Sequence, residues 1–297
     1  MFRIVFAFSV LLWARFAFAG DPKFEFGKHD ELKDVKDVEW VATAEAGLVL
    51  TAGNSQTKTL TAGLKASRKE GDNKLSLEAS AAYARATIRQ LDDKNGNGMI
   101  DDASEIESVT TTTAETFAGK LRYDRFLTDL DSVFAAALAS RDLPAGKESV
   151  FGAQIGYSRR LYKTKEIEAV GEIGYDFSRE NLIVGSPIAI HSVRAFLGYK
   201  QALAEATALD ASVELLTNLN KETLPTGKDG SAFNDTRVNA KASITAKVGK
   251  SLSVQTAIEL RYDNRPGPLA IKNLAMGFVP EAEALDTIIK ASLIYAF

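Results

Sequence analysis

Residues 75–83, LSLEASAAY, place apolar and polar or small side chains at alternate positions. Leu75, Leu77 and Tyr83 fall on one face of an extended chain, and Ser76 and Glu78 fall on the other. A period of two indicates a β-strand with one apolar face. The stretch therefore predicts a strand whose two faces meet different environments.

The same period recurs from Trp40 to the end of the chain. In an alanine-rich segment, Phe134, Ala136 and Leu138 continue the apolar set. We count about twelve such segments, which predicts an all-β chain. Because a soluble β-sandwich also alternates, the connections between the segments must decide the architecture.

Tight and long connections strictly interleave along the chain. The tight ones lie near residues 71–73, 127–131, 162–165, 203–206 and 249–251. The long ones lie near residues 86–110, 142–148, 181–188, 217–236 and 264–283. This pattern is typical of a transmembrane antiparallel up-and-down β-barrel with its apolar faces turned to lipid. We expect the barrel to span residues 38–297, with 86–110 as a long outer loop.

The composition excludes several other classes of protein. The chain has 297 residues, of which 45% are hydrophobic, with no cysteine and two histidines. Thiol chemistry and cysteine-ligated metals are excluded, and the histidines are too few for a two-histidine metal site with a histidine base. Beyond the N-terminus, no run reaches the roughly 18 apolar residues that a spanning helix needs.

The first residues predict export. Residues 1–19 carry Arg3, an apolar run and a small-x-small ending, which is the pattern of a signal peptide. Residues 20–37 are polar and predict a periplasmic extension. We therefore expect a barrel in the outer membrane with both termini in the periplasm. The acidic excess argues against a nucleic-acid partner.

Aromatic residues support contact with lipid. Tyrosines and a tryptophan fall near the ends of the apolar faces, where an aromatic girdle meets the headgroups. The chain ends at Phe297, preceded on the same face by Tyr295 and Leu293. This ending resembles the C-terminal signal that the outer-membrane barrel insertion machinery reads. We expect outer-membrane lipid and that machinery as partners.

One motif carries a family resemblance. Residues 47–57, GLVLTAGNSQT, look like the first hairpin of the salt-induced outer membrane protein family. The pattern KLRYDR at 120–125, the Gly-Tyr pairs at 156–157 and 174–175, and the aromatic terminus extend the resemblance over roughly residues 38–297. The resemblance implies a β-barrel domain of unknown function, with no substrate or catalytic residue to transfer.

Residues 93–105 match the front of a calcium-binding loop. Oxygen ligands occupy positions 1, 3 and 5, a glycine position 6 and a backbone carbonyl position 7, but Ser104 stands at position 12. The candidate Ca²⁺ ligands are Asp93, Asn95, Asn97, Met99, Asp101 and Glu105. The alternative is a solvated turn without metal.

Charged residues gather on the polar face of the strands, which a barrel turns inward. The predicted lumen charges are Glu45, Lys65, Lys120, Arg122, Glu168, Glu172, Asp176, Arg194, Arg237, Lys241, Glu259 and Arg261. Acids segregated from bases would create a transverse field that passes small polar solutes. Alternatively, the charges pair and plug a narrow interior.

Two further function classes compete with a small passive channel or a structural envelope protein. His191 beside Ser192 invites comparison with a hydrolase, but adjacent strand residues point to opposite faces. We therefore expect no catalytic residues. Loops 217–236 and 264–283 could instead bind a surface partner, the second through an apolar stretch after Arg265.

Overall fold

The computed structural model describes residues 38–51, 56–91, 106–143, 145–223, 229–268 and 282–296. Within these ranges no helix is long and apolar enough to cross a membrane. The predicted signal peptide 1–19, the extension 20–37 and Phe297 lie outside them. Those three expectations therefore stay predictions.

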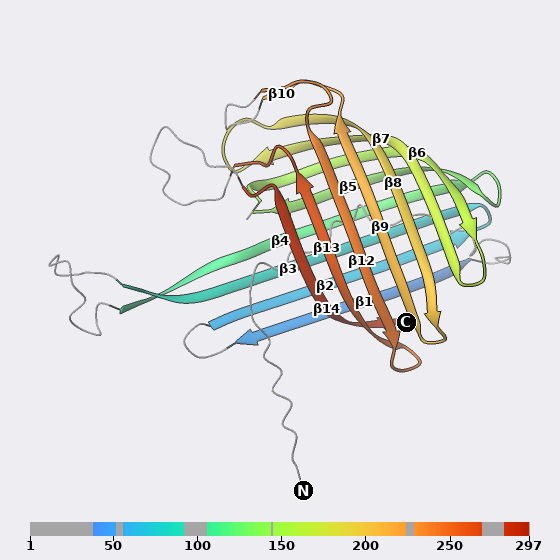
Figure 1. Cartoon of the computed structure of the whole chain (residues 1–297), viewed down its shortest axis with the longest axis horizontal. Helices are drawn as coiled ribbons and strands as arrows, with labels where there is room; N and C mark the ends of the chain where they lie inside the picture. The colour runs from blue at the N-terminus through green and yellow to red at the C-terminus, as the bar shows by residue number, and fades with distance from the viewer. Residues whose placement is uncertain are drawn as a thin grey trace, which may run out of the picture.

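Twelve antiparallel strands close into one barrel in the order β1-β14-β13-β12-β9-β8-β7-β6-β5-β4-β3-β2 (Figure 1). Their bounds are β1 Glu39–Thr51, β2 Gln56–Glu70, β3 Asn73–Leu91, β4 Ile106–Phe126, β5 Asp131–Asp142, β6 Lys147–Lys163, β7 Ile167–Leu182, β8 Ile188–Ala204, β9 Thr207–Asn218, β12 Thr236–Lys247, β13 Leu252–Asp263 and β14 Leu285–Ala296. A separate two-stranded hairpin, β10 Glu222–Thr223 and β11 Asp229–Gly230, lies between β9 and β12. The predicted fold class and strand number are confirmed.

The two ends of the barrel differ. Every second connection is a tight turn, as between Glu70 and Asn73, and we call this the turn end. The other connections include the long segments 219–235 and 264–284, and we call this the loop end. Turn-end and loop-end connections alternate as the sequence predicts, although the loop-end connections from Thr51 to Gln56 and from Asp142 to Lys147 are as short as some turns.

The wall is apolar outside and charged inside. Ile155, Ile173 and Ile289 are exposed, whereas Arg194 and Glu214 are fully buried. A soluble protein buries its apolar side chains and exposes its charged ones. The opposite distribution seen in this wall is typical of a transmembrane β-barrel.

Strand β5 corrects one assignment of faces. Phe134, Ala136 and Leu138 are buried inside the barrel, while Val133 is exposed on the outside. The strand is apolar on both faces, so its sequence gave no polar face by which to orient it.

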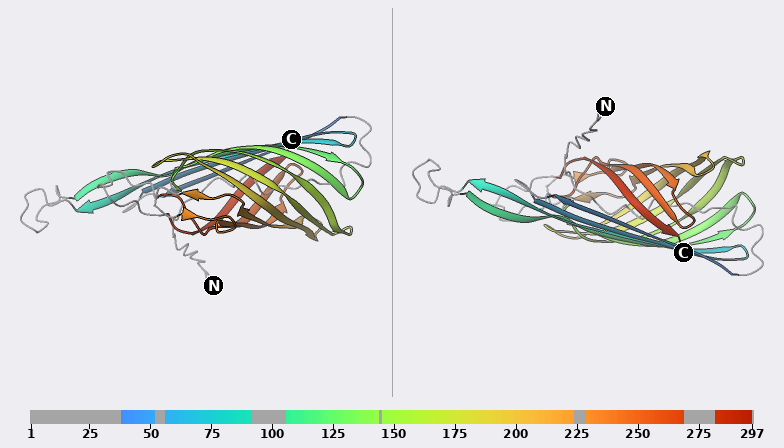
Figure 2. Two further views of the ribbon diagram at one scale, coloured as in Figure 1. Left: turned by 90° about the horizontal axis from the view of Figure 1, so that it is seen from above. Right: turned by 90° about the horizontal axis from the view of Figure 1, so that it is seen from below.

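The predicted outer loop 86–110 is also corrected. Strand β3 runs on to Leu91 and β4 starts at Ile106, so residues 86–91 and 106–110 form a paired ribbon, and residues 92–105 lie outside the described residues. The pairing of β2 with β3 ends at Thr87, so the ribbon projects beyond the wall (Figure 2). Its β-branched threonines favour strand, and Thr87 and Thr110 share a side-chain hydrogen bond of 2.8 Å.

The barrel closes at a short seam. Strands β1 and β14 pair only from Thr43↔Ala296 to Ala46↔Leu293, whereas β1 and β2 pair along the whole of β1. The two seam strands lie together near the C-terminus and diverge toward the loop end (Figure 1). The seam is therefore the least hydrogen-bonded junction of the wall.

Candidate functional site

The register places all the predicted lumen charges on the inner face of the wall, where Lys65 is exposed. Buried or half-buried are Glu45, Lys120, Arg122, Glu168, Glu172, Asp176, Arg194, Arg237, Lys241, Glu259 and Arg261. Their role in passing solutes stays a prediction. Their contacts, however, bear on whether the interior is open.

A chain of ion pairs and hydrogen bonds crosses the middle of the barrel. We call it the central ladder, and it comprises Arg122, Asp124, Glu172, Arg194, Glu214 and Asn239. Arg194 Nη1 lies 2.8 Å from Glu172 Oε2, and its Nε lies 2.6 Å from Glu214 Oε1. Asn239 Nδ2 donates to the other oxygen of Glu214 at 3.1 Å. All three charged side chains have no exposed surface.

One link of the ladder also crosses the interior. Arg122 on β4 reaches Glu172 on β7 at 2.8 Å, although β5 and β6 separate these strands in the wall. The same guanidinium lies 2.7 Å from Asp124. A contact between strands that are not neighbours must cross the interior as a chord. This link crosses part of the interior, whereas the links from Glu172 through Arg194 and Glu214 to Asn239 join neighbouring strands and follow the wall.

An aromatic ring fills the space beneath the ladder. The guanidinium of Arg122 lies 4.0 Å from the ring centroid of Phe134, and that of Arg194 lies 5.6 Å from it. Glycine at 156 makes room for this ring, because a Cβ there would lie 2.7 Å from Phe134 Cζ. The Phe134 ring therefore packs against both guanidinium groups of the ladder through cation–π contacts.

Further pairs occupy the loop-end half of the lumen. Glu259 is fully buried and lies 3.0 Å from Lys290, 3.5 Å from Lys241 and 3.8 Å from Arg261. On the opposite wall, Glu180 is paired with two cations. These are Arg237 at 2.7 Å and Lys147 at 3.2 Å.

A cavity of about 160 Å³ lies at the loop end. Glu180, Arg237 and Arg261 line it, and Pro266 and Gly267 belong to the loop beside it. Asn239 lines it too and also bonds Glu214, so the cavity ends at the central ladder. The arrangement is a charged vestibule that reaches down to the central ladder.

Sequence reasoning missed several members of this interior. Glu180 shares the parity of Glu172 and Asp176 on β7, so the period of two could have identified it. Lys290 could have been found in the same way on β14. Phe134 could not, because nothing in an apolar strand signals that its ring is needed inside.

The calcium-like motif cannot be placed. Residues 92–105, which hold every proposed Ca²⁺ ligand, lie outside the described residues. Among the residues that the structure describes, no cluster of three or more acidic or histidine side chains could hold a metal ion.

His191 and Ser192 lie on opposite faces of β8. The His191 ring is half-buried, hydrogen-bonds Tyr175 Oη through Nδ1 and lies 5.1 Å from the Phe177 ring. Ser192 is buried on the other face of the strand. The histidine therefore cannot serve this serine as a base.

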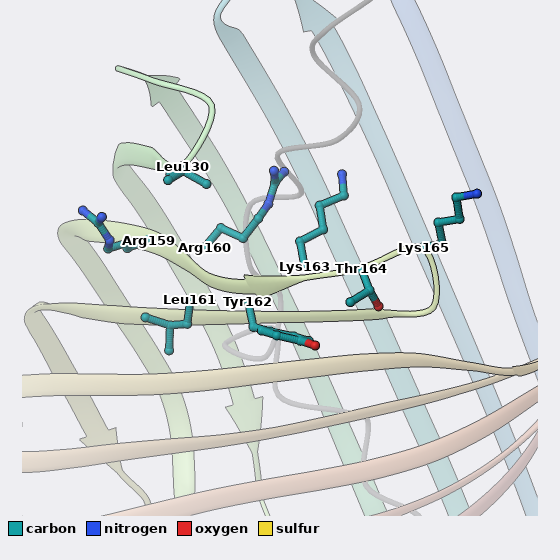
Figure 3. A pocket seen from close by; sticks show the side chains of 8 residues that line it. All are labelled: Leu130, Arg159, Arg160, Leu161, Tyr162, Lys163, Thr164 and Lys165. Atoms are coloured by element: carbon teal, nitrogen blue, oxygen red, sulfur yellow. The ribbon is translucent and has the colours of Figure 1, made fainter.

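A second hollow, of about 620 Å³, follows β6 at the turn end (Figure 3). Arg160, Lys163 and Lys165 point to one side of the chain, and Leu161 and Tyr162 point to the other. A bulge between Arg160 and Tyr162 turns two adjacent apolar side chains the same way. No described carboxylate lines this hollow, so it offers no acid–base pair.

Comparison with known proteins gives a family and distant folds. Residues 44–297 match the model of a family described as "Protein of unknown function, DUF481". No curated protein matches the chain. The chain is similar to solved outer-membrane structures at low identity. The NanC porin has 12% identity and a TM-score of 0.40 over 86% of this chain and 97% of that one. The translocator domain of the autotransporter NalP from Neisseria meningitidis has 14% identity and a TM-score of 0.40 over 90% of this chain and 91% of that one. An anion-selective porin from Comamonas acidovorans has 10% identity and a TM-score of 0.37 over 88% of this chain and 99% of that one.

Proposed function

The chain belongs to this family of unknown function, DUF481, so we propose its function from the interior of its own barrel. We propose that it is an outer-membrane β-barrel whose lumen is closed at rest and that serves as a structural envelope protein. The exposed apolar outer wall supports insertion in a membrane. The signal-like residues 1–19 and the aromatic C-terminus support the outer membrane, with the turn end in the periplasm.

One observation carries the closed state. Arg194 is fully buried between Glu172 and Glu214, and the same ladder continues as a chord to Arg122. Ions that cross the barrel must break these contacts. Removing one partner of a buried pair leaves an uncompensated charge, so the ladder resists opening. This favours the plugged interior over the transverse field that the segregated charges suggested.

Planar bilayer recordings test the proposal. The purified wild-type barrel is expected to insert without giving steady conductance steps. Arg122→Ala combined with Arg194→Ala removes both cations of the central ladder and should produce steps, while Arg125→Ala at the turn-end rim should not. Steady open steps in the wild type would instead support the alternative, a small passive channel for polar solutes.

The projecting ribbon favours a second candidate function. Strands β3 and β4 continue to pair as far as Leu91↔Ile106, beyond both neighbouring strands. A ribbon held clear of the wall is suited to binding a surface partner, so we propose adhesion as the alternative role. Deleting residues 88–109 should abolish binding of cells or phage while leaving the barrel folded. If binding survives, the ribbon is not the binding element.

The family resemblance adds a physiological expectation. If the chain is a salt-induced outer membrane protein, its transcript should rise when external salt is raised. Constant transcript levels across that change would contradict salt induction but would not bear on the proposal that the lumen is closed.

A further inference from the structure

Two cations face each other on the outer wall near the loop end. Lys58 on β2 lies directly opposite Arg85 on β3, and both are exposed. The next outward pair toward the turn end is Leu60↔Tyr83, and both of these side chains are exposed and apolar or aromatic. The basic pair therefore stands directly above a lipid-facing apolar surface.

The pair has no acidic register partner, and Glu115, which lies opposite Tyr83, is paired with Arg141 at 3.4 Å. The register neighbours of the two cations are Leu50 on β1 and Thr112 on β4, neither of which is acidic. The Arg85 guanidinium lies 5.2 Å from the Tyr83 ring centroid, and no ion pair links either cation to a described carboxylate. Like charges placed directly opposite each other destabilise a sheet. An anion between them would remove that cost.

Other exposed arginines of the wall have carboxylate partners. At the turn end, Arg68 pairs with Glu70 at 2.6 Å, and Arg159 pairs with Asp131 at 3.0 Å. Arg125 lies 3.5 Å from a third carboxylate, that of Asp72. Near the loop end, Arg141 likewise lies 3.4 Å from the carboxylate of Glu115. The chain thus supplies a carboxylate to each of these four exposed arginines, but no ion pair links Lys58 or Arg85 to a described carboxylate.

We propose that Lys58 and Arg85 bind the phosphate headgroup of a lipid in the leaflet at the loop end. Guanidinium offers a fork of donors that suits phosphate, and the ammonium adds a point charge. Long basic side chains extend from an apolar wall to the headgroups while their stems cover it. The acyl chains of the same lipid would lie along Leu60 and Tyr83. This inference rests on the proposed membrane location but not on a closed lumen.

Lipid binding to the purified barrel in detergent tests the inference. The probes are lipopolysaccharide and the same lipopolysaccharide after enzymatic removal of its phosphates, followed by native mass spectrometry. Wild type should prefer the phosphorylated form. A basic residue near an anionic lipid surface changes affinity roughly fivefold, so Lys58→Gln with Arg85→Gln should weaken binding roughly 25-fold and abolish the preference.

The controls separate binding from folding. Arg125→Gln removes an exposed cation that has its own carboxylate and should keep the full preference. Lys58→Arg keeps the charge and should also keep it, and heat-dependent gel mobility verifies that each barrel is folded. Equal binding of both lipopolysaccharides by the wild type, or an unchanged preference in the double variant, overturns the inference. Neither result affects the bilayer recordings that test the closed lumen.

Discussion

Arg194 lies between two carboxylates in the middle of the barrel, at 2.8 Å from Glu172 and 2.6 Å from Glu214. Arg194→Met would leave both carboxylates buried and short of one cation. Breaking a buried pair from one side costs about 3 to 5 kcal/mol, so the free energy of unfolding should fall by that amount. Urea unfolding in lipid vesicles, followed by tryptophan fluorescence, measures the loss.

Lys120 provides the matched control for Arg194. It is as deeply buried, but its Nζ has no hydrogen-bond partner among the described residues. Lys120→Met removes a desolvated charge without orphaning a hydrogen-bonded acceptor, so we expect a loss of about 1 kcal/mol or less. Equal losses for the two variants would contradict the view that pairing, and not burial alone, makes the ladder stable.

The packing at Gly156 gives a second prediction. A Cβ at this position would lie 2.6 Å from the carbonyl oxygen of Ile173 and 2.7 Å from the Phe134 ring. Overpacking of this kind costs about 1 to 3 kcal/mol, so Gly156→Ala should lower the unfolding midpoint in urea. At Gly119 the nearest atom would be 3.8 Å away, and Gly119→Ala should be tolerated. Similar midpoints for the two variants would argue against the tight fit of Phe134.

The alternation of apolar and polar residues determines which features of the fold and of the lumen could be predicted from the sequence. Parity assigns each side chain to a face, so the strands, the alternating connections and most inward charges could be predicted. It says nothing of which inward side chains meet, and the chord from Arg122 to Glu172 depends on barrel closure and curvature. Parity also fails where both faces are apolar, as around Phe134, and where threonines extend a ribbon into an expected loop.

The short seam predicts a difference in cross-linking rates. The cysteine-free chain allows two double-cysteine variants, one at Ala46 and Leu293, which are register partners, and one at Leu48 and Ala291, which would be partners only if pairing continued. Disulfides need Cα atoms within about 7 Å, so the first pair should oxidise readily and the second slowly. Gel mobility after mild oxidation measures both. Equal rates would mean that β1 and β14 pair along their full length.

Calcium binding remains a proposal that rests on residues 93–105. If Asp93, Asn95 and Asn97 supply ligands, calorimetry of the purified barrel should record heat on calcium addition, with a Kd of about 10⁻⁴ to 10⁻³ M. Asp93→Ala should remove that heat, whereas Asp129→Ala in a tight turn should not. A wild type without heat, indistinguishable from Asp93→Ala, excludes the metal site.

Glu222 should make the segment between β9 and β12 sensitive to pH. Burial, reinforced by the nearby Asp235 carboxylate, raises the pKa of Glu222 from its ordinary 4.5 to about 7, although Arg237 and Arg265 oppose the shift. Because the folded segment holds this proton more tightly than the unfolded chain does, the stabilisation is complete below about pH 4.5 and is lost as the pH rises through 7. The segment should therefore be more ordered at pH 5 than at pH 8.5.

A spin label at Thr223→Cys reports this change, because the chain has no other cysteine. Its spectrum should broaden at pH 5 and sharpen at pH 8.5, since a more mobile label gives narrower lines. In Glu222→Gln the amide cannot ionise, so the spectrum should stay broad at both pH values. A Gln variant that keeps the full pH response would assign the titration to another group, with Asp235 as the nearest carboxylate to replace next.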